Sequence, residues 1–187
     1  GVELSGAWQV TSWARWDANL SLSTNRIKDY VAYLYTEKDA EVERKVGNTT
    51  ISFSPSAVLN NRFAVRKGGF EAALTTQYVS RQYLDNLAMA DNSLDAYCVS
   101  HLSASYDFKI KGLKGLTLGA TVYTKWAGDA LVALLDSPLF YNRFNAKDET
   151  NGYSQTSIDS ATGNLVSDPR FYPMAGTNVL ANVGIKF

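Results

Sequence analysis

The sequence has little of what metal centres, disulfide-rich folds and transmembrane helices require. Its 187 residues include one cysteine, Cys98, and one histidine, His101, so neither a disulfide framework nor a cysteine–histidine metal site is expected. Basic and acidic residues are balanced at 18 each, which implies no general attraction to nucleic acid. No segment approaches the roughly 18 continuous apolar residues of a membrane-crossing helix. These absences still allow a membrane protein built from strands, because such strands alternate rather than run apolar.

Motifs for bond chemistry are also missing. The chain has no glycine-rich phosphate loop, no nucleophile elbow and no pair of carboxylates at helical spacing. A hydrolase embedded in a barrel would need serine, histidine and acidic residues at one rim, whereas His101 falls in mid-strand. We therefore expect no enzyme, no cofactor and no metal. His101 is interpreted as a polar residue of a wet interior, and Cys98 as a small apolar residue facing lipid.

What the sequence does have is a two-residue period, which is clearest in its last nine residues. Apolar side chains recur at every second position, and the alternate positions include Asn182, Gly184 and Lys186. This pattern predicts a strand with one apolar and one polar face. The chain stops on an aromatic residue, as outer-membrane barrels do where they present a signal to their assembly machinery. The candidate signal consists of Val183, Ile185 and Phe187.

Six further segments show the same period, which gives seven predicted strands. They lie at about 2–9, 16–23 continuing towards 30, 50–66, 70–81, 94–108 and 116–126. The connections alternate between short and long. Residues 36–48 are dense in charge and are interpreted as a solvated loop, whereas 127–170 shows no sustained alternation and includes a predicted short helix at 130–135.

The aromatic content and the connection pattern together favour an all-β, antiparallel transmembrane barrel. There are 11 Tyr, 8 Phe and 4 Trp, as expected where rings gather at two membrane interfaces. Strands of about 15 residues, at ~3.3 Å each, would be roughly 50 Å long. A membrane needs only about 9 to 11 residues per strand, so the strands are expected to project beyond it.

Seven strands cannot form a finished bacterial barrel. Such barrels have an even number of strands, at least eight, and an open edge in lipid costs several kcal/mol for each unpaired backbone group. The chain begins inside a strand-like pattern without a signal peptide. We therefore interpret residues 1–187 as the C-terminal part of a larger barrel.

Several segments, in order, resemble the late barrel strands of TonB-dependent outer-membrane receptors. They are Gly1–Leu4, Trp13, Asn19–Ser23, Asn60–Arg62, Tyr78–Asn86, Leu116–Tyr123, Phe171–Pro173, Gly176–Asn178 and the closing strand to Phe187. One departure is Thr124–Asp129, where the family carries a segment similar to Asn-Leu-Phe-Asn.

The resemblance implies a 22-stranded barrel with an N-terminal plug, located in the outer membrane of a Gram-negative bacterium. Such receptors import iron-siderophores, haem, cobalamin or glycans with energy passed on by TonB. Implied partners are the rest of the barrel and its plug, the TonB complex, the barrel-assembly machinery and lipid, with no nucleic acid. The plug and the TonB-contacting segment would precede Gly1. The alternative is a passive or adhesive outer-membrane barrel without a plug.

Candidate ligand contacts lie in the loops and on the predicted inner wall. They are Tyr30, Arg62, Arg81, Tyr141 and Arg143. Charges on the inner wall could dock a plug or guide a ligand, or they could be satisfied by water and cross-strand pairs. Aromatic residues of the loops could grip a ligand or belong to the outer interfacial girdle.

Overall fold

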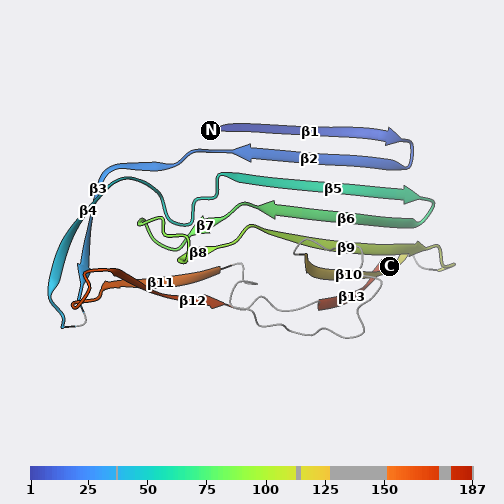
Figure 1. Cartoon of the computed structure of the whole chain (residues 1–187). Helices are drawn as coiled ribbons and strands as arrows, with labels where there is room; N and C mark the ends of the chain where they lie inside the picture. Colours follow the sequence, from blue (N-terminus) through green and yellow to red (C-terminus); the bar gives the residue numbers. More distant parts are fainter. Residues whose placement is uncertain (37, 113–114, 127–150, 173–177, 187) are drawn as a thin grey trace.

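A computed structural model describes residues 1–36, 38–112, 115–126, 151–172 and 178–186, and this part of the chain is all-β with antiparallel ladders (Figure 1). Seven strands form one sheet in the order β1-β2-β5-β6-β9-β10-β13. Their bounds are β1 Val2–Thr11, β2 Ala14–Leu22, β5 Ala57–Lys67, β6 Phe70–Val79, β9 Tyr97–Phe108, β10 Gly115–Trp126 and β13 Asn178–Lys186. The seven segments predicted from alternation are these seven strands.

The register of the sheet gathers the predicted apolar positions on one face. Trp8 lies opposite Trp16, which lies opposite Phe63, so the three side chains occupy one row of the same face. Ser5, paired through Asn19 to Asn60, begins a row of the opposite face. Because side chains alternate along every strand, this pairing makes the sheet apolar on one face and polar on the other.

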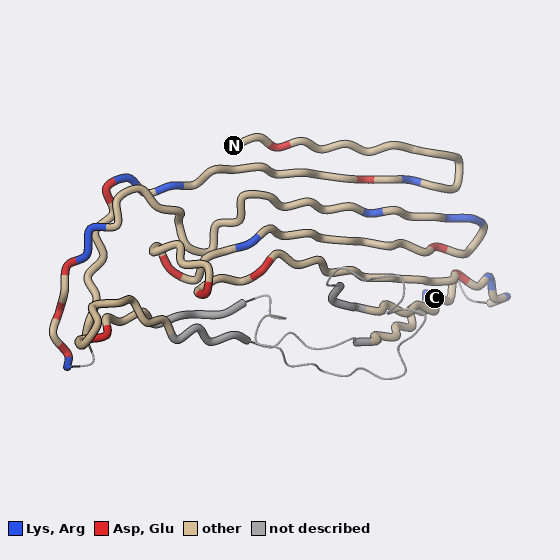
Figure 2. Tube along the Cα trace, in the orientation of Figure 1, with Lys and Arg blue, Asp and Glu red and all other residues tan. Residues whose placement is uncertain are grey.

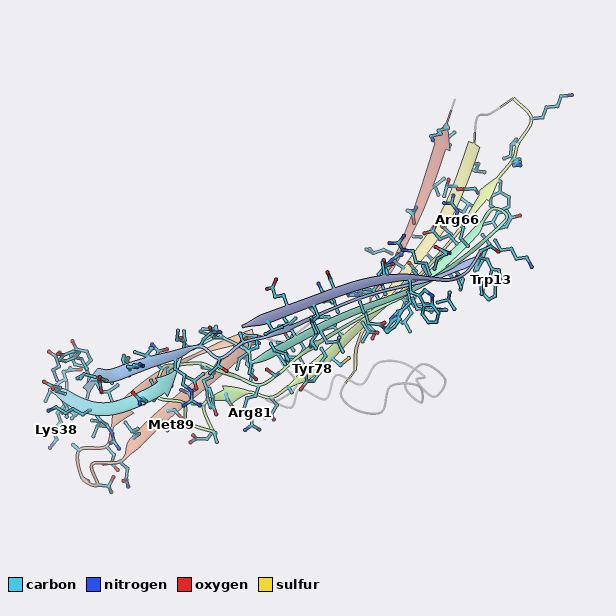
Figure 3. The ribbon with its side chains drawn as sticks, turned by 90° about the horizontal axis from the view of Figure 1, so that it is seen from above. Trp13, Lys38, Arg66, Tyr78, Arg81 and Met89 are labelled. Carbon is cyan, nitrogen blue, oxygen red and sulfur yellow. The ribbon has the colours of Figure 1, made fainter. Side chains whose placement is uncertain are left out.

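Short turns join the strands at one end of the sheet, where Figure 3 labels Trp13 and Arg66. The β5–β6 turn requires both of its glycines. Gly68 has a φ of 61°, and a Cβ added to Gly69 would lie 2.5 Å from the backbone oxygen of Asp107. Lys186 pairs with Gly115, so β13 ends on the side of the short turns, as the sequence predicts.

The opposite end carries three additional two-stranded elements (Figure 1). They are β3 Arg26–Tyr35 with β4 Glu41–Thr50, β7 Gln82–Tyr83 with β8 Ser93–Leu94, and β11 Asn151–Ile158 with β12 Leu165–Tyr172. Two predictions are therefore wrong. Residues 36–48 are mostly the second strand of a hairpin rather than a loop, and the segment 127–170 contains a hairpin. The predicted helix at 130–135 lies outside the described residues.

The longest strands predicted for the main sheet are also shorter in the structure. They have 9 to 12 residues, because β2 ends at Leu22 and β5 begins only at Ala57. Residues 51–56, expected to extend β5, instead contain Phe53 at a φ of 51°, which breaks an extended strand. Pro55 lies just before β5, outside the ladder, where its missing N–H costs no strand hydrogen bond.

The cluster of buried apolar side chains that pack together lies between the outer hairpins. Ala32, Leu34 and Ile158 are buried together. On the sheet, by contrast, Val183 is 67% exposed and Leu118 is 42% exposed. No described segment covers these side chains with a second layer (Figure 3).

Candidate functional site

A hollow on the polar face of β1, β2, β5 and β6 is the first candidate site. Its volume is about 480 Å³. The polar-face residues that line it are Ser5, Ala7, Asp17, Asn19, Asn60, Arg62 and Thr75. Asn60 Nδ2 donates to Asn19 Oδ1 at 2.8 Å across the two strands. The hollow can offer amide, carboxylate and guanidinium groups to a polar ligand.

The charged side chains around this hollow form ion pairs. The Arg15 guanidinium contacts Asp17 at 2.6 Å, and Glu71 lies 3.6 Å from Arg62 and 3.9 Å from Arg66. All five side chains are between 31% and 73% exposed, so solvent screens these pairs and each contributes little to stability. Arg62 and Arg66 pair with Glu71 across β5 and β6, whereas Arg15 and Asp17 lie in one strand.

His101 lies on the same polar face, at the level of Thr75 in the adjacent strand. No group of three or more His, Cys, Asp or Glu side chains that could hold a metal occurs among the described residues. Cys98 lies on the apolar face opposite Tyr78 and is half-buried.

The predicted ligand contacts of the outer end do not converge with Arg62. Arg81 follows β6 and pairs with Asp95 at 3.2 Å, in the region that Figure 3 labels beyond Tyr78. Tyr30 is half-buried and packs against the core of Ala32, Leu34 and Ile158. Tyr30 therefore stabilises the β3–β4 hairpin.

Two other tyrosines lie better for contact with a ligand. Tyr33 and Tyr35 are 63% and 57% exposed near the tip of the β3–β4 hairpin, and Figure 3 labels Lys38 at that tip. Figure 2 shows that charged residues are frequent along this hairpin and sparse along the strands of the main sheet.

The remaining site predictions concern the C-terminal part of the chain. Val183 and Ile185 lie on the exposed apolar face of the edge strand β13, opposite Leu118 and Leu116. Tyr141, Arg143 and Phe187 lie outside the described residues.

A buried polar cluster at the outer end was not predicted from the sequence. Asp85 Oδ2 accepts hydrogen bonds from Asn92 Nδ2 and from Thr156 Oγ1, both at 2.7 Å. Asn92 is fully buried, and its Oδ1 has no hydrogen-bond partner within the described part of the chain. Because 71 residues separate Asp85 from Thr156, no local sequence pattern indicates this contact.

Comparisons with known proteins identify no family for this chain. No protein-family model matches the sequence, and no curated protein matches it. No helix in the described ranges is long and apolar enough to cross a membrane. The geometry defines a two-faced antiparallel sheet with open edges, short turns at one end and packed hairpins at the other.

Proposed function

We propose that this chain forms part of an outer-membrane active transporter that binds a scarce ligand and imports it with energy from TonB. One observation carries the proposal: a seven-stranded antiparallel sheet exposes apolar side chains on one face and has a polar hollow on the other. A transmembrane barrel has this distribution, with lipid outside and water inside. The resemblance of the strands to TonB-dependent receptors adds the active, ligand-specific part of the proposal.

Strand length supports a membrane span. The seven strands have 9 to 12 residues, close to the 9 to 11 that a tilted transmembrane strand needs. At ~3.3 Å per residue and a tilt of about 45°, they rise roughly 20–30 Å, which matches the hydrocarbon core. The outer hairpins then extend beyond the bilayer.

A band of exposed aromatic side chains supports the same orientation. Each of the first five strands of the sheet contributes at least one aromatic residue to the apolar face near the short turns, and all are 40–61% exposed. These residues are Trp8, Trp16, Phe63, Phe70, Tyr106 and Phe108. An aromatic girdle at one membrane interface has this composition.

The slant of this band agrees with the tilt of transmembrane strands. Phe70 and Tyr106 lie level with Lys67 of β5, four residues nearer the short turns than Phe63. Phe108 lies two residues further in the same direction. Six residues at ~3.3 Å are about 20 Å along the strands, against about 19 Å for four spacings of ~4.8 Å across them. The band therefore crosses the strands at about 45°, and barrel strands tilt by about 35–45°.

The two edges of the sheet support completion by further strands. Seven alternating strands leave β1 and β13 running in the same direction. A closed barrel with only antiparallel neighbours therefore needs an odd number of additional strands. The implied barrel of 22 strands meets this condition with 15 more.

The alternative is a passive or adhesive barrel without a plug. Planar-bilayer conductance of the natural-length protein, together with uptake by cells with and without the inner-membrane energy supply, separates the two. The proposal predicts negligible free conductance and energy-dependent accumulation of one of four candidates: an iron chelate, haem, cobalamin or an oligosaccharide. A stable open channel with energy-independent passage would favour the passive barrel and contradict the importer.

A further inference from the structure

Three segments that are distant in the sequence pack together at the outer end of the molecule. They are the β3–β4 hairpin, the loop at 84–92 and the β11–β12 hairpin. Leu87 of the loop packs against the buried cluster that Ala32 and Leu34 of β3 form with Ile158 of β11. Thr36 also forms an isolated bridge with Ile158. The contacts between the hairpins are therefore apolar and continuous with those of the loop.

The Asp85 carboxylate fastens the loop to the β11–β12 hairpin. Its Oδ2 accepts from Thr156 Oγ1 and from Asn92 Nδ2, and its Oδ1 accepts from the backbone N–H of Leu87 at 2.9 Å. The Asn92 backbone closes the loop on itself, because the N–H of Leu84 donates to the backbone carbonyl of Asn92 at 3.1 Å. A carboxylate with three donors is an acceptor that an amide cannot reproduce.

The next residue in the chain fastens the same loop to the base of the β3–β4 hairpin. Thr49 Oγ1 donates to the Asn86 carbonyl at 2.7 Å, and the N–H of Ser52 donates to Asn86 Oδ1 at 2.7 Å. Thr49 is buried. Asp85 and Asn86 thus connect one short loop to two separate hairpins through side chains and backbone together.

We propose that the loop at 84–92 is a hub that joins both outer hairpins into one rigid cap, which moves as a single body relative to the sheet. Independent flexible loops would not need polar side chains buried at their mutual junction. The cap presents Tyr33 and Tyr35 on its surface. A ligand that displaces the β3–β4 tip would therefore also displace the β11–β12 hairpin. The inference depends on packing of the described residues and does not require that the sheet cross a membrane.

Hydrogen exchange of the full chain in detergent micelles tests the hub. Asp85→Asn replaces one carboxylate oxygen by an NH₂ group, which would face the donors that now bind the carboxylate. The change disrupts the junction with almost no change of side-chain volume. We expect amide exchange about tenfold faster in β3, β4, β11 and β12 together, since neighbouring elements that form one cooperative unit open together. Exchange in β6 serves as the internal standard for an intact sheet, and the exposed Asp91→Asn, with the same charge change in the same loop, is the control.

A second pair of variants tests the junction from the other side. Thr156→Val removes the hydroxyl at similar volume and should accelerate exchange in both hairpins, whereas Thr156→Ser should retain the protection of the unmodified chain. Spin labels at Asp39→Cys and Ser160→Cys, in a Cys98→Ser background, should give a narrow distance distribution that broadens with Asp85→Asn. Faster exchange confined to 84–92, or a distance distribution that is broad from the start, would overturn the single cap.

Discussion

At the scale of the residue, the turns and the buried polar groups determine where this sheet can bend and end. Gly68 and Gly69 could be recognised in the sequence as a turn. The need for a glycine at position 69 could not, because it arises from Asp107, whose N–H donates to the Gly69 carbonyl at 2.8 Å. The Asp85 cluster was unpredictable for the same reason: its partners come from separate hairpins.

Gly69 gives a direct test of this close approach. An alanine there would place its Cβ 2.5 Å from the backbone oxygen of Asp107, so the turn or β9 must shift. We expect Gly69→Ala to lower the free energy of unfolding by about 1–3 kcal/mol. Gly6→Ala, at a strand position with open space around the added Cβ, should cost nothing or stabilise slightly. Urea unfolding in micelles measures both, and equal effects would contradict the close contact.

Asp159 provides a pH-dependent contact at the tip of the β11–β12 hairpin. Hydrogen bonds from the Ala161 N–H, at 2.8 Å, and from the Thr162 hydroxyl, at 2.8 Å, lower the pKa of its carboxyl below the ordinary 3.8. Because the pKa is lowered, the ionised carboxylate stabilises the turn fully when the pH is above the ordinary carboxyl pKa. This stabilisation is lost as the pH falls through the lowered pKa.

Carbon-detected NMR of the Asp159 carboxyl measures this pKa directly. We expect a midpoint below the ordinary value and a simultaneous upfield shift of the Ala161 amide proton on acidification. Asp159→Asn should remove the pH step at Ala161, because the amide does not titrate. A carboxyl midpoint at or above 3.8 would contradict the hydrogen bonds assigned to this turn.

At the scale of the element, alternation predicted the strands of the main sheet but not those of the outer hairpins. In the sheet each face has a uniform environment, so apolar and polar or small residues alternate in the sequence from Leu116 to Val122. The β4 strand carries Glu41, Glu43, Arg44 and Lys45 on a narrow, solvated hairpin, and its density of charge indicated a loop. The all-β, antiparallel class was therefore predictable, and the outer hairpins were not.

The edges of the two kinds of element differ in the same way. β1 has a single charged residue, Glu3, along ten exposed positions, and β13 has only Lys186. Charged side chains protect the β4 edge against pairing with another chain, whereas β1 and β13 lack this protection. This contrast is expected if β4 ends in solvent and the sheet edges are covered by further strands. Figure 2 shows it along the chain.

At the scale of the whole molecule, the proposed transporter requires one face of the sheet to meet lipid and the other to meet water. In the proposed barrel, the apolar face with its slanted aromatic band would meet lipid, and the face that carries the hollow would meet water. The candidate ligand contacts then separate into an inner wall around Arg62 and an outer cap that carries Tyr33 and Tyr35. A ligand would meet the cap first and the wall afterwards.

The most direct measurement is the accessibility of single spin labels placed along β9, from Ser100 to Phe108, in the natural-length protein reconstituted into lipid bilayers. Collisions with oxygen, which concentrates in lipid, and with a water-soluble nickel chelate are compared at each position. If the sheet faces lipid, oxygen should dominate at Leu102, Ala104 and Tyr106, whereas nickel should dominate at Ser103 and Ser105. Equal nickel access at all five positions, or protection of Leu102, Ala104 and Tyr106 from both reagents, would contradict a lipid-facing sheet.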